Sequence, residues 1–332
     1  MVGYTLGGGL PLLGRKYGFA SDHVIAFDLV TPDGELRRVD AVSEPRLFSL
    51  LRGGKGNYGV VTAMEFALFP AAELYAGGLF YEGAHAREVL AGFRSWTQDL
   101  PSEASASLAF LRLPDLEDVP AFLRNKFVMH LRFAWQGSAE EGTALLAPMR
   151  AAAPVLVDAV GPLPYERIDE IHADPQHPVP VREGGMLLKG FGPGLEEALL
   201  QLAGPESQAP LLLTEIRLMG GALSAPPNAA GPDCVGGRDA GLSFFAVGVM
   251  VPPIDHLVAA AIEAARSALV PYATGGSLVN LHGHLASPEL AAGAWPEALR
   301  QAMGEAKTEL DPKNLFRHGH AVLPSTPGAA AA

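Results

Sequence analysis

Two pairs of histidines are the residues whose spacing most directly suggests chemistry: His282 with His284, and His318 with His320. In a strand, residues two apart point to the same face of the sheet, so each pair could present two imidazoles to one ion. Four imidazoles can bind zinc, but no Asp or Glu accompanies them at the spacing of a zinc signature. Histidines more often lie at a surface or line a core. We therefore predict no metal site and keep a His-x-His metal enzyme as the weaker alternative.

Two glycine-rich segments near the start of the chain suggest a ligand instead. Gly7, Gly8 and Gly9 form either a turn or a backbone that passes close to a flat or anionic ligand. Residues 54–59 match the G-x-G-x-x-G spacing of dinucleotide-binding loops. A helix is predicted before this segment and a strand after it, which reverses the order that places phosphate at a helix N-terminus. We therefore predict no Rossmann loop. We also predict no Walker A loop, because no Ser or Thr follows Lys55.

Composition and charge exclude several other functions. The 24 basic and 36 acidic residues give a net charge of −12, which repels nucleic-acid phosphates. The longest apolar stretch, 244–251, is far shorter than the ~20 residues of a membrane helix. No secretory signal is visible and Cys234 has no second cysteine to pair with, so we predict a cytoplasmic protein. The sequence lacks a Gly-x-Ser-x-Gly elbow, and nucleophilic hydrolysis is not favoured.

The elements that position these residues are those of an α+β protein. Apolar residues make up 48% of the chain, and 38 glycines with 28 prolines suit a loop-rich fold better than a helical bundle. Strands at 24–31 and 35–39 flank a Pro-Asp-Gly turn and predict a hairpin. A helix capped by Ser43 is predicted to end before Gly53, and a strand is predicted at 60–69.

The remainder of the chain predicts an antiparallel sheet backed by helices. The clearest helix is 255–269, with a stripe of apolar residues behind Asp255 as its cap. Residues 220–241 predict a long loop. The predicted strands are 74–81, 106–113, 127–135, 211–218 and 242–250.

A run of short motifs resembles the second half of the FAD-binding domain of berberine-bridge-enzyme-like oxidoreductases, which are of the vanillyl-alcohol-oxidase, or PCMH, type. Near the other end, Asn280 and residues 311–317 resemble that family's C-terminal signature, and residues 215–222 resemble a strand and turn of its substrate domain. The motifs of the first part are Gly3-Tyr4-Thr5-Leu6-Gly7-Gly8-Gly9, Arg15-Lys16-Tyr17-Gly18, Asp22-His23-Val24, Thr31-Pro32-Asp33-Gly34, Leu47-Phe48 and residues 52–62.

This resemblance implies an α+β fold in which a partial PCMH-type FAD-binding domain, residues 1–70, joins a substrate domain, residues 71–274. The substrate domain would carry the antiparallel sheet backed by helices. Residues 275–326 would return to the FAD-binding domain, and residues 327–332 would form a disordered tail. The implied cofactor is FAD, and it requires the segments around positions 7 and 57 to lie side by side.

The resemblance also implies roles for individual residues. The reaction would be hydride transfer from an alcohol or similar C–H donor, a small molecule, to flavin N5, with oxygen as the final acceptor. A base must accept the hydroxyl proton, and the candidates are Tyr4, Tyr272 and Glu215. Arg217 would orient an anionic or hydroxylated substrate, or form a salt bridge with a strand neighbour. The implied cofactor-binding residues are Gly7, Gly8, Gly9, Tyr17, Gly18, Asp22, His23, Asn57, Tyr58, Gly59, Val60, Val61, Asn280, Asn314 and Arg317.

Several departures from the family pattern bear on activity. The family's first FAD subdomain, with its pyrophosphate loop and flavin-linked histidine, has no counterpart before Met1. Leu278 replaces the tyrosine of the family's Tyr-x-Asn, and Gly319 and Ala321 replace the asparagines of Arg-x-Asn-x-Asn. We therefore expect weak FAD binding or none, and a separate chain is a candidate partner that supplies the missing subdomain. A truncated or inactive member, and a non-catalytic remnant or binding protein, stay open as alternatives.

Overall fold

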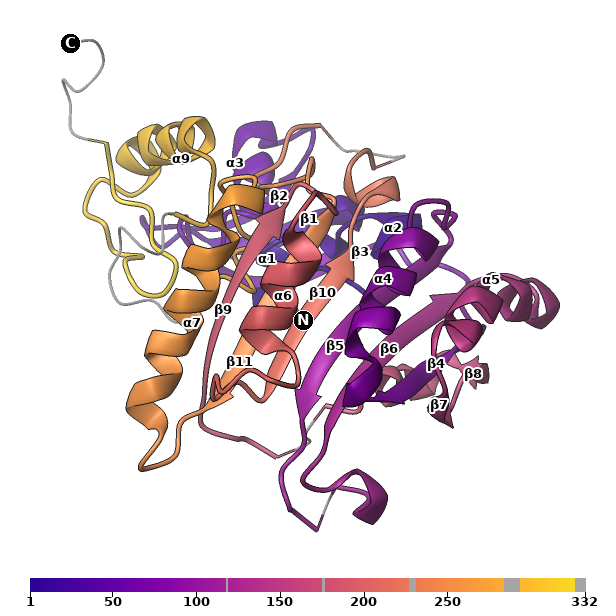
Figure 1. Cartoon of the computed structure of the whole chain (residues 1–332). Helices are drawn as coiled ribbons and strands as arrows, with labels where there is room; N and C mark the ends of the chain where they lie inside the picture. The colour runs from indigo at the N-terminus through magenta and orange to yellow at the C-terminus, as the bar shows by residue number, and fades with distance from the viewer. Residues whose placement is uncertain (118, 175–176, 227–230, 284–292, 326–332) are drawn as a thin grey trace. The chain divides into compact units, whose positions relative to one another are not determined.

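The computed structural model describes residues 1–117, 119–174, 177–226, 231–283 and 293–325, and these form two units (Figure 1). The first unit contains Met1–Phe69, Ala222–Arg238 and Gly275–Ala332, and the second contains Pro70–Gly221 and Asp239–Thr274. The predicted tail, 327–332, lies outside the described residues.

One predicted boundary is wrong, because residues 222–238 belong to the first unit rather than to the predicted substrate domain. Long-range contacts, among them the following two, hold this segment. Arg238 Nη2 lies 2.5 Å from Asp22 Oδ1, and the Cys234 amide donates to the carbonyl of Arg52 over 2.7 Å. The partners are far apart in the sequence, so local patterns carry no sign of them.

The first unit contains a three-stranded antiparallel sheet in the order β2-β1-β3. The predicted hairpin is confirmed as β1 (Val24–Val30) and β2 (Leu36–Asp40). Strand β3 (Val60–Phe66) ends three residues earlier than predicted. Helix α3 (Pro45–Leu51) begins at a proline with Glu44 as N-cap, so the predicted cap at Ser43 is wrong. Proline suits this first helical position because the missing N–H has no partner there in any helix.

Further helices belong to this unit, and the first and the last of those given below share a core with the sheet. The core includes Phe27, Phe48, Leu51, Tyr58 and Met303, all of which are almost completely buried. The helices are α1 (Val2–Leu6), α2 (Gly14–Tyr17), the 3₁₀ turn η1 (Ala20–His23) and α9 (Glu297–Leu310). The 3₁₀ turn η5 (Gly221–Leu223) starts the segment that crosses into this unit.

The second unit is built on an eight-stranded antiparallel sheet in the order β7-β4-β6-β5-β10-β11-β9, with β8 also paired to β4. All five predicted strands are confirmed, whereas β7, β8 and β9 were not predicted. The strands are β4 (Glu73–Glu82), β5 (Ala104–Arg112), β6 (Phe127–Trp135), β7 (Val155–Asp158), β8 (Gly161–Pro164), β9 (Val181–Leu188), β10 (Leu213–Leu218) and β11 (Leu242–Val249).

Helices back one face of this sheet, as predicted (Figure 1). They are α4 (Ala86–Trp96), α5 (Ala139–Ala152), α6 (Leu195–Ala203) and α7 (Asp255–Leu269). Val258 and Ile262 of α7 share one buried core with Leu131 and Ile216 of the sheet. Burial of each such side chain stabilises the fold by about 1.5–3 kcal/mol. The predicted cap at Asp255 is wrong, because α7 starts at that residue and Ile254 is its N-cap.

The described part of the second unit also contains the 3₁₀ turns η2 (Gly83–His85), η3 (Ala121–Leu123), η4 (Tyr165–Ile171) and η6 (Val270–Tyr272). Among the residues that the structure describes, no helix combines the length and the apolar character needed to cross a bilayer.

Candidate functional site

The two glycine-rich segments of the first unit lie side by side, as predicted. The carbonyl oxygen of Leu6, which ends α1, accepts hydrogen bonds from the amides of Gly53 (3.0 Å) and Lys55 (2.9 Å). Both donors follow α3, so the backbone that leaves α1 is fastened to the backbone that leaves α3. Gly7 is therefore held against the second segment.

Gly7, Lys55 and Asn280 form a small polar site that we call the Gly7 cradle. A Cβ atom on Gly7 would lie 2.7 Å from Lys55 Cε and still closer to Asn280 Oδ1, so only glycine leaves room for both side chains. Asn280 Nδ2 donates to the carbonyl of Tyr4 over 2.8 Å, and its Oδ1 accepts from Lys55 Nζ. Lys55 Nζ also donates to the carbonyl of Gly3 over 3.0 Å.

Lys55 occupies this site in a backbone conformation that normally favours glycine. Its φ is +60°, in the left-handed region. Burial lowers the pKa of its ammonium from the ordinary value. The strained backbone and the partly buried charge indicate that the surrounding contacts, rather than local preference, fix this lysine.

Asn57 joins the cradle to the C-terminal segment. Its Nδ2 donates to the carbonyls of Gly54 (2.7 Å) and His320 (3.0 Å), and its Oδ1 accepts from the amide of Val322 (2.8 Å). Its side chain is 1% exposed. The Asn57 side chain is therefore satisfied by protein groups, and its part in the site is to hold backbone in place.

A buried ion pair explains the Asp-Pro-Lys-Asn motif. The ammonium of Lys307 on α9 lies 2.8 Å from Asp311 Oδ2, and both side chains are completely buried. Lys307 Nζ also donates to the carbonyls of Asn57 and Phe316, each over 2.7 Å. Asp311 accepts further hydrogen bonds from the amides of Leu315 (2.8 Å) and Phe316 (3.0 Å). This pair ties α9, the Asn57 loop and the motif together.

His320 brings an unpaired nitrogen to this region. Its buried Nε2 has no hydrogen-bond partner among the described residues. Burial, together with the charge of Lys55, lowers its pKa to about 4, so the ring is neutral near pH 7. Of the other triplet, His282 Nδ1 is hydrogen-bonded to Ser277 Oγ, and His284 lies outside the described residues. The described part of the chain contains no group of three or more His, Cys, Asp or Glu that could hold a metal ion.

The other predicted cofactor residues of the first 23 positions lie where the chain after Gly7 folds back against η1. The carbonyls of Gly8 and Gly9 accept from the amides of Ser21 and Ala20, each over 2.9 Å. Asp22 accepts from the Phe19 amide (2.8 Å) and from Arg238, and a Cβ on Gly18 would meet its carboxylate.

Tyr17 and His23 pack against the same ring. The rings of Tyr17 and Phe69 stack at 4.2 Å between centroids, and the His23 ring lies edge-on to Phe69 at 4.5 Å. His23 Nε2 is also hydrogen-bonded to the Tyr17 carbonyl over 2.7 Å. These two predicted contacts to the cofactor stay predictions.

The predicted cofactor residues around position 59 are held by contacts within the first unit, and their role in binding stays a prediction. Tyr58 is fully buried and donates from its hydroxyl to the Met303 carbonyl over 3.1 Å. A Cβ on Gly59 would meet the Val30 carbonyl, while Val60 and Val61 belong to β3. Near the C-terminus, Arg317 is exposed, and the buried Asn314 Oδ1 has no hydrogen-bond partner among the described residues.

A second site lies in the other unit, on the face of the large sheet opposite the helices. His130 and Arg132 come from β6, Glu215 and Arg217 come from β10, and His172 follows η4; we call them the β6–β10 polar cluster. The residues that alternate with them along both strands point into the helix-backed core. Strand alternation therefore places all four strand residues on one face.

Glu215 lies at the centre of this cluster. Arg132 Nη1 donates to Glu215 Oε1 over 3.1 Å, and Arg132 Nε donates to His130 Nδ1 over 3.3 Å. Arg217 Nη2 lies 3.2 Å from each carboxylate oxygen of Glu215 and 3.0 Å from His172 Nε2. Because Arg217 can only donate, His172 Nε2 accepts, and the ring proton of this histidine is on Nδ1.

The buried surroundings set the charges of the cluster. Burial, with the charges of Arg132 and Arg217, lowers the pKa of His172 to about 3. Burial also lowers the pKa of His130 well below its ordinary value. Burial alone would raise the pKa of Glu215, but Arg217 and Arg132 hold it far below the ordinary value. At neutral pH the cluster contains two cations, one anion and two neutral rings.

Tyr272, one of the three predicted bases, does not join this cluster. It packs against the helix-backed core, and a Cβ on Gly194 would lie 2.8 Å from its hydroxyl. Glu215 belongs to the opposite face of the same sheet. The structure thus brings Glu215 and Arg217 together and places Tyr272 elsewhere in the same unit.

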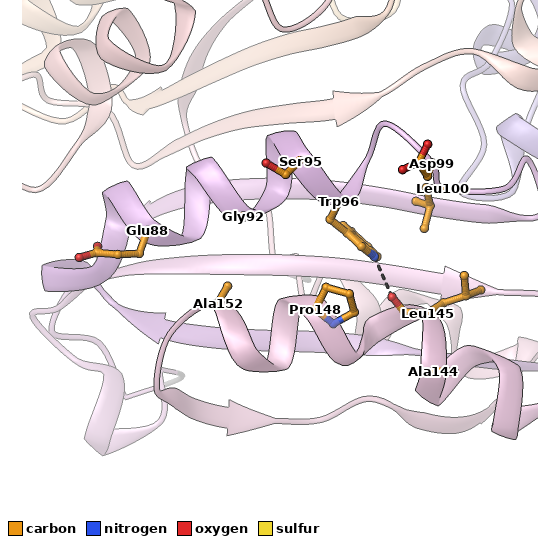
Figure 2. A pocket seen from close by; sticks show the side chains of 10 residues that line it. All are labelled: Glu88, Gly92, Ser95, Trp96, Asp99, Leu100, Ala144, Leu145, Pro148 and Ala152. Carbon is orange, nitrogen blue, oxygen red and sulfur yellow. Dashed lines mark hydrogen bonds between the residues drawn. The ribbon is translucent and has the colours of Figure 1, made fainter.

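The helix face of the second unit carries a surface groove of about 660 Å³ between α4 and α5 (Figure 2). Trp96 Nε1 donates to the Leu145 carbonyl across it over 2.7 Å. Pro148 lies inside α5, on the other wall from Trp96, and has no amide to donate to the preceding turn. None of the predicted site residues lines this groove.

The sequence predictions missed Lys55, Arg132, His130, His172 and Lys307. A signal existed for two of them, because His130 and Arg132 are polar residues two apart in an otherwise apolar strand. Two polar groups on one face of a buried strand need partners, which predicts a polar cluster. No local pattern marks His172, whose partner Glu215 lies 43 residues away, or the hydrogen bond from Lys307 to the Asn57 carbonyl, 250 residues away. Of the Lys307 contacts, the ion pair with Asp311, four residues on, is local.

Comparison with known proteins gives partial sequence matches. No family profile matches the chain. An FAD-linked oxidoreductase of Dictyostelium discoideum is 36% identical over 109 residues, which cover 32% of this chain and 24% of that protein. An uncharacterised FAD-linked oxidoreductase of Arthroderma benhamiae is 33% identical over 97 residues, which cover 29% of this chain and 19% of that protein. The matched segment thus spans a quarter or less of these relatives' lengths.

Solved structures match nearly the whole chain. BBE-like 1 of Physcomitrella patens superposes with a TM-score of 0.82 at 18% identity, covering 98% of this chain and 70% of that one. The 6-hydroxy-D-nicotine oxidase of Arthrobacter nicotinovorans gives 0.79 at 20% identity, covering 98% and 71%. The fold is that of berberine-bridge-enzyme-like, PCMH-type flavoenzymes. The resemblance to FAD-linked oxidoreductases that the motifs predict is confirmed in sequence and in fold.

Proposed function

We propose that this chain is an FAD-linked oxidoreductase that removes hydride from an alcohol or similar C–H donor. The observation that carries the proposal is the Gly7 cradle, in which two glycine-rich segments and Asn280 meet, as the resemblance to FAD-linked oxidoreductases implies. The names of the sequence relatives, which are FAD-linked oxidoreductases, support the same cofactor.

The residues of the first unit fit the polar edge of a flat ring system. His320 Nε2 and Asn314 Oδ1 are buried polar atoms without partners among the described residues. A ligand that supplies hydrogen bonds would remove the free-energy penalty of such atoms. Lys55 adds the positive charge that would hold an anionic ring edge.

FAD, when bound, would supply the two-electron acceptor for a substrate C–H bond. The chain's own task is then to accept the hydroxyl proton of the substrate. Glu215 is a weak base here, because two arginines stabilise its carboxylate. Among the predicted bases we favour Tyr4, whose carbonyl holds Asn280 and whose ring packs against Gly9.

Anaerobic reduction of the bound flavin tests the proposal. The chain is supplied with FAD and mixed with a panel of alcohols and amines, and the visible flavin band is followed. At least one donor should bleach the band, and oxygen should restore it. Tyr4→Phe should slow bleaching about a hundredfold, whereas Tyr165→Phe, at an exposed position on η4, should not. FAD that is retained but bleached by no donor would instead identify a non-catalytic binding protein.

A further inference from the structure

The β6–β10 polar cluster carries an unbalanced charge in a buried place. The side chains of Arg132 and Glu215 are 3% and 8% exposed, and that of Arg217 is 22% exposed. With both histidines neutral, two guanidinium groups face a single carboxylate, so the cluster has a net charge of +1. A buried charge without a counter-ion is unfavourable, and an anion placed beside it would be strongly attracted.

Arg217 is the more exposed of the two arginines, so a ligand would contact the excess positive charge through its guanidinium group. All of its hydrogen bonds within the described structure, to Glu215 and His172, use Nη2. Its Nε and Nη1 groups therefore have three N–H donors with no protein partner in the described residues. Arginine satisfies such donors best with a planar oxyanion, because its N–H groups match carboxylate geometry.

The sheet register keeps this guanidinium in place. Ser107 of β5 lies between Arg132 and Arg217 in one row across the sheet, and this small residue allows both arginines to reach Glu215. Glu215 and His172 together fix Nη2. A guanidinium fixed by its neighbours loses little conformational entropy when it binds a ligand.

An aromatic side chain adjoins the charged groups. Phe245 of β11 lies directly opposite Glu215 on the same face, and it is partly exposed. The same face therefore offers an apolar ring next to a charged donor, which suits a ligand with an apolar body and one acidic group.

We propose that Arg217 binds the carboxylate of an organic acid with an apolar body, and that Glu215 and His172 are positioning residues for its guanidinium. The inference rests on the proposed function only where it identifies this acid as the substrate class of the oxidoreductase. The binding site itself stands on the contacts within the second unit. The cluster is thus a carboxylate site, and a neutral hydroxylated ligand would leave its charge unbalanced.

Calorimetric titration of the full chain without added FAD tests this site, with benzoate as the probe and benzamide as its neutral counterpart. Benzoate should bind at least about tenfold more tightly than benzamide, because charge-assisted hydrogen bonds are stronger than neutral ones. Arg217→Met should weaken benzoate binding at least about tenfold, and Arg217→Lys should retain part of it. Arg87→Met, which removes the same charge from an exposed position on α4, should have no effect.

Three results would overturn the site: equal binding of benzoate and benzamide, no benzoate binding to the wild-type chain, or equal losses in Arg217→Met and Arg87→Met. The comparison of the two ligands on the wild-type chain decides the question even if Arg217→Met does not fold. Benzoate binding without flavin bleaching in the donor assay would leave the carboxylate site intact and reject the proposed function. Flavin bleaching without benzoate binding would support the proposed function and reject the carboxylate site.

Discussion

Replacement of Lys307 by methionine tests how the first unit is held together. The ammonium makes three hydrogen bonds of 2.7–2.8 Å, to Asn57, Asp311 and Phe316, and no part of the side chain is exposed. Lys307→Met leaves the Asp311 carboxylate buried without its cation. Breaking a buried ion pair in this way costs about 3–5 kcal/mol. At about 2–4 °C per kcal/mol, the unfolding midpoint should fall by about 6–20 °C.

The stability that is lost in Lys307→Met should depend on pH in a way that identifies the buried ion pair as the cause. Burial opposes the charge of Asp311, but Lys307 and two backbone amides hold the pKa of this carboxyl below its ordinary value. A depressed carboxyl pKa contributes stability above the ordinary value of about 4, and this contribution is lost as the pH falls through the folded-state pKa. In Lys307→Met the carboxyl group can protonate more readily. The difference between wild type and variant should therefore be largest near pH 7 and shrink towards pH 3.

Thermal unfolding followed by near-ultraviolet circular dichroism measures both effects. Lys313→Met is the matched control, because Lys313 lies in the same motif and is exposed. It should shift the midpoint by no more than a degree or two, as exposed substitutions change stability by about 0.5 kcal/mol or less. Equal midpoints for Lys307→Met and Lys313→Met would refute the view that this ion pair anchors the Asn57 loop.

Three further predictions concern the ionisable groups. Glu215→Gln should lower stability by about 3–5 kcal/mol in urea unfolding, because two arginines lose their counter-charge; an unchanged midpoint would contradict the pairing. The pKa of His172, about 3 in the folded state and about 6.5 when unfolded, means that the unfolded chain takes up the proton first. His172 alone should therefore contribute a drop in stability of about 2 kcal/mol from pH 7 to pH 5. The total drop should be smaller by that amount in His172→Gln than in the wild type, to which His130 and His320 also contribute because their pKa values are lowered. Cys234 is 2% exposed and burial raises its pKa to about 12, so its thiol should react with iodoacetamide only after denaturation; rapid labelling of the native chain would show that the thiol is accessible.

Much of the fold could be predicted because its elements carry local signals. The hairpin has a Pro-Asp-Gly turn between strand-forming residues, and α7 has a regular apolar stripe. Strand β9 carries weaker signals, since Gly184 and Gly185 interrupt its apolar pattern. Helix α1 is too short and too rich in poor helix formers to be recognised from its sequence. What fixes these two elements is packing and pairing with distant residues.

The candidate site could be predicted only in part, because it too depends on contacts between residues that are far apart in the sequence. Gly7 and Asn280 were found because their motifs resemble those of a known family, and the structure brings them together. Lys55 was visible only as one member of a glycine-rich match, with no sign that its ammonium would reach Asn280, 225 residues away. Residues 222–238 belong to the first unit, where Arg238 contacts Asp22, and no local pattern links these two positions.

The most direct test of the account is a titration of the purified chain with FAD, followed by the visible flavin spectrum. The wild-type chain should change the flavin spectrum until its binding site is saturated. The affinity should be weak, as the departures from the family motifs predict. Gly7→Ala should abolish this signal, since its methyl group would displace the side chains of Asn280 and Lys55. Gly3→Ala, where a methyl group meets no atom within 4 Å, should bind as the wild type does. No saturable change with the wild-type chain up to millimolar FAD, or equal binding by both variants, would contradict the flavin site at Gly7.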